Sequence, residues 1–153
     1  MMMIGPAPLQ FVVTPDETLV INIYQEVRHV YTDGRDHPRE EDRWATTWGD
    51  SVGRWEGDTL VIDTVSVREP SRFFQAAPPF SEQARYVERL RKTAPDRIET
   101  EITVDDSSAL SRPWTVKTAY RRTPNLDRLV HDAFDNDRSE LAGETFAIAP
   151  PQR

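Results

Sequence analysis

Residues 51–67, SVGRWEGDTLVIDTVSV, place the tightest constraint on how this chain can fold. Residues 52–56 alternate in character, and residues 60–67 are rich in β-branched side chains, which suit a pleated, half-buried surface. Gly57-Asp58 stands between them at the centre of a short loop, where glycine readily takes the positive φ that a hairpin turn needs. The stretch therefore predicts a β-hairpin in the middle of a sheet protein.

Short strand-like runs recur along most of the remaining chain. In residues 97–104, isoleucine, threonine and valine alternate with glutamate and threonine, which is the period of a half-buried strand. No run of helical period separates these runs, and short connections join most of them. The predicted strands occupy residues 9–13, 18–25, 27–32, 52–56, 60–67, 85–92, 97–104 and 114–120. The runs 18–25 and 27–32 are either two strands joined by a turn at Gln25-Glu26 or one long strand with a bend there.

Consecutive strands usually pair with their neighbours, and a meander of strands has two exposed edges unless it closes on itself. We therefore predict an all-β fold, an antiparallel up-and-down β-barrel of about eight strands, with a β-sandwich as the alternative. Apolar residues after Pro124 fall at helical spacing and predict a short C-terminal helix or an extra strand. Residues 1–153 are expected to form one barrel domain, with a loose tail at 147–153.

Charge and hydropathy restrict the partners and the location of the protein. The formal net charge is −7, which argues against nucleic acid, because that partner needs a basic surface. No run approaches the roughly 18 apolar residues of a membrane span, so no membrane association is expected. The first ten residues are too short and too weakly apolar for a signal peptide. This predicts a cytoplasmic location, unless a secretion leader has been removed from the sequence.

Several kinds of chemistry lack their sequence signals. The chain has no cysteine, no Gly-x-Ser-x-Gly elbow and no phosphate-binding glycine loop. Its three histidines, His29, His37 and His131, form no HxH or HExxH pair, so no metal site and no cofactor are expected. His37 is interpreted instead as a loop residue whose ring closes a turn. Acid–base chemistry by ordinary side chains is the best remaining possibility.

Four segments carry a family resemblance, and they lie within residues 27–118. The residues are Tyr31, Asp33, Gly34, Arg35, His37, Pro38, Gly53–Thr64, Ser81, Glu82, Glu88, Arg89, Pro113, Trp114 and Thr115. They resemble a large group of mostly uncharacterised bacterial proteins with the signature Y-x-D-G-R-x-H-P, G-R-W-E-G-D-T-L-V-V-D-T, S-E-x-x-H-x-x-E-R and P-W-T. The resemblance implies no particular activity. The predicted architecture is also similar to the calycin-like (lipocalin-like) barrels, which include lipid carriers and some cofactor-free enzymes.

The chain departs from this signature at Arg85, which stands where the pattern has its second histidine. A changed substrate explains the departure, and so does drift without function.

The candidate catalytic residues are Asp63 and Glu88, assisted by His29 and Tyr31. Asp63 lies inside an apolar run, and Glu88 shares a face with Tyr86 and Leu90. A carboxylate facing the interior of a small barrel is desolvated, which raises its pKa toward the range useful for proton transfer. The alternative is that Asp63 faces solvent or pairs with an arginine such as Arg54 or Arg89, and that Glu88 does the same with Arg28.

Aromatic residues are the candidate ligand contacts. They are Trp48, Trp55, Phe73, Phe74, Trp114 and Tyr86. Tryptophans in a barrel are more often core residues than ligand contacts. Trp44 lies apart in the polar loop 33–47, which suits a lid residue or an interface residue.

These observations favour a cofactor-independent acid–base enzyme of the isomerase, cyclase or hydratase/lyase type, acting on a small, mainly apolar organic molecule in the barrel cavity. A non-catalytic barrel that binds a small hydrophobic ligand is the alternative. A fully packed interaction domain is a third possibility. A homodimer formed through the loop 33–47 is also compatible with the sequence.

Overall fold

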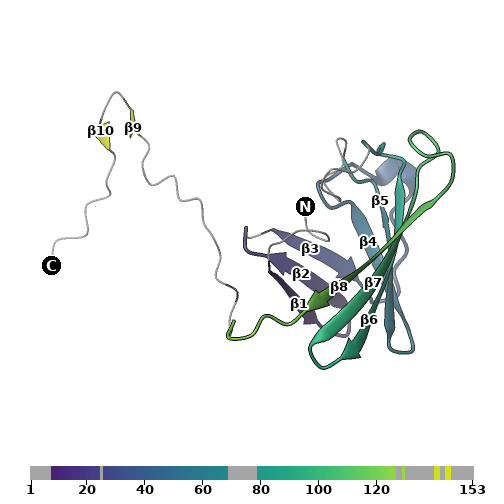
Figure 1. Cartoon of the computed structure of the whole chain (residues 1–153). Coiled ribbons are helices and arrows are strands. Elements are labelled where there is room, and N and C mark those ends of the chain that lie inside the picture. The colour runs from purple at the N-terminus through teal and green to yellow at the C-terminus, as the bar shows by residue number, and fades with distance from the viewer. Residues whose placement is uncertain are drawn as a thin grey trace.

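Eight strands follow one another in a single curled sheet in the computed structural model, which describes residues 8–24, 26–68, 79–126, 129, 140–141 and 144–145. The sheet forms a half-barrel (Figure 1). Its strands are β1 (Leu9–Val13), β2 (Glu17–Asn22), β3 (Val27–Tyr31), β4 (Asp50–Glu56), β5 (Thr59–Val65), β6 (Arg85–Ala94), β7 (Arg97–Asp105) and β8 (Trp114–Arg121). The prediction of an all-β fold with eight strands in chain order is confirmed.

Two smaller elements complete the described part of the chain. A short 3-10 helix, η1 (Glu40–Asp42), lies in the loop before β4. Strands β9 (Glu140–Leu141) and β10 (Glu144–Thr145) pair with each other in a separate two-stranded sheet. The predicted helix or strand after Pro124 falls mostly outside the described residues, and the predicted tail at 147–153 lies outside them altogether. None of the described helices has the length and apolarity needed to cross a bilayer.

The central hairpin has the predicted form. Strands β4 and β5 pair from Asp50↔Val65 to Glu56↔Thr59, which leaves two residues in the turn. Gly57, the first of them, has a φ of +62°. Glycine is needed there because side chains with a Cβ adopt this conformation only at a cost.

One junction in the sheet differs from the prediction. All neighbouring strands are antiparallel except β3 and β4, which are parallel and meet at the pair Tyr31↔Val52. A parallel pair needs a long crossover connection, and the polar loop at 33–47 supplies it. A strictly antiparallel meander is therefore wrong at this one step.

The two outermost strands approach each other through side chains. The described strand order runs from β1 to β8 without a hydrogen-bonded pairing of these two. The rings of Phe11 in β1 and Tyr120 in β8 nevertheless lie with centroids 5.6 Å apart. The curled sheet is thus a half-barrel whose two edges are bridged by an aromatic contact.

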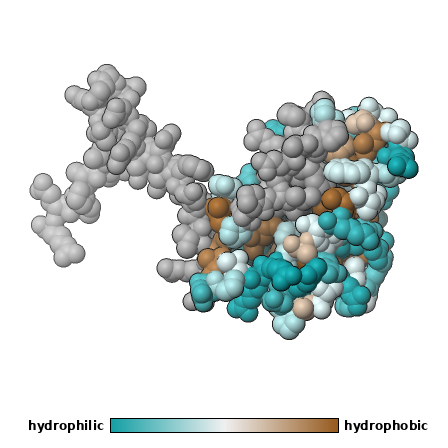
Figure 2. Space-filling model, in the orientation of Figure 1, coloured by the Kyte–Doolittle hydropathy of each residue, from teal (hydrophilic) through white to brown (hydrophobic). Residues whose placement is uncertain are grey.

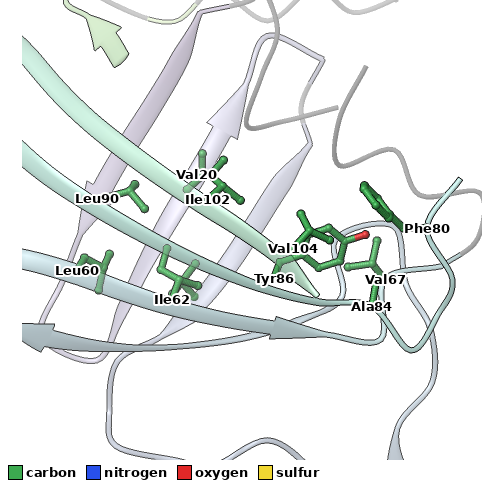
Figure 3. Close-up of a cluster of buried hydrophobic side chains, with 11 residues drawn as sticks. Val20, Leu60, Ile62, Val67, Phe80, Ala84, Tyr86, Leu90, Ile102 and Val104 are labelled. Carbon is green, nitrogen blue, oxygen red and sulfur yellow. The ribbon is translucent and has the colours of Figure 1, made fainter. Parts of the chain in front are cut away.

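The core lies on the concave side of the sheet. Its buried members include Val20 of β2 and, on the neighbouring strands β5, β6 and β7, Ile62, Tyr86 and Ile102 (Figure 3). Side chains alternate between the two faces of a strand, so the residues directly before and after each of these four point outward. The face shown in Figure 2 is mostly hydrophilic over the described residues, with smaller hydrophobic patches.

Candidate functional site

An ion pair is buried inside the half-barrel. Arg28 of β3 and Glu88 of β6 contact each other, and their side chains are 1% and 0% exposed. Nη2 of Arg28 also donates to the hydroxyls of Ser51, at 3.1 Å, and Thr64, at 2.8 Å. The two hydroxyl oxygens lie 2.9 Å from each other. Glu88 therefore faces the interior, as predicted, and is paired with Arg28, as the structural alternative required.

Other polar groups line the same interior. Burial raises the pKa of the Tyr120 phenol, and the negative charge of Glu88 raises it further, so Tyr120 remains protonated. Within the described residues, Oε1 of Glu88 and the hydroxyls of Thr18 and Thr100 are buried without a hydrogen-bond partner. Such atoms in proteins usually contact a water or a ligand.

Asp63 does not face the interior, which corrects the sequence interpretation. Ile62 and Thr64 are fully buried on the inner face, so the residue between them points outward. Its carboxylate accepts hydrogen bonds from the Arg85 side chain, with Nε to Oδ1 at 2.8 Å. This hydrogen bond raises the pKa of Arg85. Asp63 is paired as the alternative expected, but with Arg85 rather than Arg54 or Arg89.

His29 and Tyr31 also lie on the outer face. Their rings stack with centroids 6.1 Å apart, and Nδ1 of His29 lies 3.0 Å from Oε2 of Glu17. The guanidinium of Arg35 lies over the Tyr31 ring, 4.0 Å from its centroid. The expected grouping of His29 and Tyr31 with Glu88 in one interior site is therefore wrong, because the sheet separates them.

A histidine and an aspartate form a second polar site, on the outer face. His37 comes from the loop before β4, and its Nδ1 lies 2.5 Å from Oδ1 of Asp50. Its side chain is 14% exposed, and its Nε2 lies 4.0 Å from Oδ1 of Asp63. Within the described part of the chain, this Nε2 is buried without a hydrogen-bond partner. One imidazole thus lies between two carboxylates.

We call His37, Asp50, Asp63 and Arg85 the outer cluster. Arg35 lies beside it, since the charge of Asp50 contributes to the raised pKa of Arg35, after the larger effect of the hydrogen bond to Asp33. The cluster draws on three of the four signature segments, through His37, Asp63 and position 85. Residues far apart in the sequence therefore meet at one place on the sheet.

Backbone geometry fixes Asp50 at the start of β4. Gly49, the residue before it, has a φ of +69°. A Cβ at this position would lie 2.4 Å from the carbonyl oxygen of Val65 and 2.8 Å from Cγ2 of Val67. Only glycine allows the loop to approach β5 this closely.

The predicted aromatic contacts do not gather into one site. Tyr86 is buried in the core, and Trp48 packs against the core from its edge. Trp55 and Trp114 are 49% and 39% exposed. Phe73 and Phe74 lie outside the described residues.

The sequence reasoning missed Asp50 and Arg85 as members of a site and assigned His37 only a turn-closing role. One signal was available. Ile62 and Thr64 are apolar or β-branched and point inward, so the alternation of the strand places Asp63 on the outer face. In the part of the chain that the structure describes, no group of three or more His, Asp or Glu side chains is placed to hold a metal ion.

Comparison of the chain with protein-family models, curated proteins and solved structures gave no match.

Proposed function

We propose that the protein is a cofactor-independent acid–base enzyme whose chemistry takes place at the outer cluster. The observation that supports this most directly is the contact between Asp50 and Nδ1 of His37. A carboxylate that accepts a hydrogen bond from Nδ1–H fixes the tautomer of the ring and leaves the Nε2 lone pair to accept a proton.

The rest of the cluster suits the same role. The carboxylate of Asp63, 4.0 Å from Nε2, stabilises the imidazolium that forms when His37 takes up a proton. Arg85 holds that carboxylate in place. The Arg85 side chain is 60% exposed, so a substrate can reach this end of the cluster from solvent. The reaction is a proton transfer on a small organic molecule, as in isomerisation, cyclisation, water addition or elimination.

The interior pair is less suited to proton transfer. Glu88 is tied to Arg28, and both side chains are almost fully buried. Removing either charge would leave the other one buried and unpaired. We therefore assign this pair a structural role.

A non-catalytic role as a carrier of a small, mainly apolar ligand is the second candidate. It is favoured by the buried Oε1 of Glu88 and the buried hydroxyls of Thr18 and Thr100, which have no hydrogen-bond partner within the described residues. A ligand with one polar group inside the half-barrel would supply such a partner.

Hydrogen exchange on small substrates tests the enzymatic proposal. The protein is incubated in D2O with a panel of small carbonyl compounds, and loss of their C–H proton NMR signals is followed. We expect at least one compound to exchange faster than in buffer, and His37→Gln to slow that exchange about a hundredfold or more. His29→Gln is the matched control, because this exposed histidine lies outside the outer cluster. Equal rates for the wild type and His37→Gln would reject the proposal.

A further inference from the structure

A small hollow lies next to the outer cluster and shares Asp50 with it. Its volume is about 150 Å³, which is smaller than the pockets that hold drug-sized ligands and suits a group of a few heavy atoms. We call it the Trp44 hollow. Its walls are Pro38, Asp42, Arg43, Trp44, Thr46, Gly49, Asp50 and Ser66.

The indole of Trp44 is the most exposed large hydrophobic side chain in the described part of the chain, at 77%. Single exposed apolar side chains are common on protein surfaces, but this ring also forms a wall of the hollow, so it is available to an occupant. The ring face carries partial negative charge and attracts cations. The exposed ring therefore points to an occupant that stacks against it.

The charges around the hollow also favour a cation. Asp42 and Asp50 line it together with the guanidinium of Arg43, but Asp42 is already paired with Arg39, with Nη2 3.0 Å from Oδ2. Asp50 is therefore the carboxylate that can serve an occupant of the hollow. Nε of Arg43 donates to the carbonyl of Pro38 at 2.6 Å, which holds this side chain against that wall. Asp50 contacts His37 through only one oxygen, Oδ1, so its carboxylate can also interact with a cation in the hollow.

The hollow is built on rigid and strained backbone. Thr46 forms a parallel bridge with Val67, and its amide donates to the carbonyl of Ser66 at 3.1 Å. Ser66 has a φ of +58°, a conformation that residues other than glycine rarely adopt. Such strain concentrates at binding sites, and the loop is held in shape before a ligand arrives.

We infer that the Trp44 hollow binds the ammonium group of a small organic cation, with Trp44 as the aromatic face and Asp50 as the counter-charge. The inference rests on the proposed function in one respect: it makes the substrate of the outer cluster a cationic molecule whose head lies beside Asp50. The reacting part of that molecule then extends toward His37.

Three probes of nearly the same shape test the inference: choline, neutral 3,3-dimethylbutan-1-ol and anionic 3,3-dimethylbutanoate. Each is titrated into the full chain, and the indole N–H signal of Trp44 is followed by NMR, assigned from its loss in Trp44→Phe. We expect saturable binding of choline, at least about tenfold tighter than that of either other probe. Equal binding of the neutral probe, preference for the anion, or no saturation with choline would overturn the inference.

Two variants test whether choline binds at the Trp44 hollow. Trp44→Ala should weaken choline binding at least about tenfold, whereas Trp55→Ala, which removes another exposed indole, should leave it unchanged. Unchanged binding in Trp44→Ala would overturn the inference, as would a dimer in sedimentation that depends on Trp44, because the ring would then be a subunit contact.

The two proposals fail separately. Choline binding without His37-dependent exchange leaves the cation site standing and rejects the enzymatic proposal. Exchange that depends on His37, without choline binding, does the reverse.

Discussion

Arg28 and Glu88 lie on strands β3 and β6, far apart in the sheet order, and their charges meet inside the half-barrel with almost no exposure to solvent. The pair joins the two arms of the curled sheet through a polar contact, and the hydroxyls of Ser51 and Thr64 accept further hydrogen bonds from Arg28. The outer cluster lies on the other side of the same sheet. The inner face of the sheet thus carries the pair that stabilises the fold, and the outer face carries the candidate chemistry.

Breaking this pair should destabilise the protein strongly. Glu88→Gln leaves a buried guanidinium without its counter-charge, and we expect a loss of about 3–5 kcal/mol in the free energy of unfolding. The double variant Arg28→Met/Glu88→Leu replaces both charges with apolar groups and should recover most of that loss. Urea unfolding of the three proteins measures both effects. A double variant as unstable as the single one would contradict the account of the pair.

Gly49 should be the least replaceable of the described turn glycines. In Gly49→Ala the new Cβ meets the carbonyl oxygen of Val65 at 2.4 Å, in addition to the strain of a positive φ. We expect a loss of more than about 2 kcal/mol. Gly57→Ala is the control, because its φ is also positive but no atom lies within 4 Å of the added Cβ. Its cost should be about 1 kcal/mol. Thermal unfolding of both variants measures the two losses of stability. Equal losses would show that the close approach of Gly49 to Val65 adds no cost.

Asp106 should make stability depend on pH in the acid range. Burial opposes its ionisation, but hydrogen bonds from the amides of Ser81 and Ser108 and from the Ser81 hydroxyl outweigh that effect and lower its pKa below the ordinary 3.8. Its stabilising contribution is then complete above this ordinary value. The contribution is lost as the pH falls through the lower pKa of the folded state.

The variant Asp106→Asn isolates this effect, because it cannot ionise. We expect the wild type to be more stable than the variant at pH 7, and the difference to shrink as the pH falls below about 4. Urea unfolding across pH 2–7 measures it. A difference that stays constant over this range would show that ionisation of Asp106 does not matter.

Arg85 should tune the chemistry of the outer cluster more than the stability of the fold. Its side chain is largely exposed, so Arg85→Ala should change the free energy of unfolding by no more than about 1 kcal/mol. Without this side chain, the Asp63 carboxylate loses the group that holds it beside His37, so the exchange rate should fall. The measurement is the exchange rate at pH 7, with Arg89→Ala as the control. An unchanged rate in Arg85→Ala would show that Arg85 does not contribute to the site.

The strands were predictable because the two-residue period and the Gly-Asp turn are local properties of the sequence. The inward position of Glu88 follows from the same period, since it shares a face with Tyr86 and Leu90. The same argument, applied to Asp63, should have placed it outward. Its apolar neighbours are also typical of a strand buried on both faces, so the local composition obscures the alternation.

The outer cluster was not predictable in the same way. The contact between His37 and Asp50 depends on how a loop without period crosses from β3 to β4, and that crossing makes the two strands parallel. The length of this loop was the one available signal, because a parallel neighbour needs a long connection. The pairing of Asp63 with Arg85 across β5 and β6 depends on register, which the sequence did not specify closely enough to choose among several arginines.

The central claim is that proton transfer takes place at the outer cluster and not in the interior of the half-barrel. Its most direct test is the exchange rate of one responsive compound, measured side by side on His37→Gln and on Arg28→Met/Glu88→Leu, with both variants shown to be folded. The account predicts that exchange is lost in the first variant and kept in the second. Exchange kept in His37→Gln and lost in the double variant would contradict it.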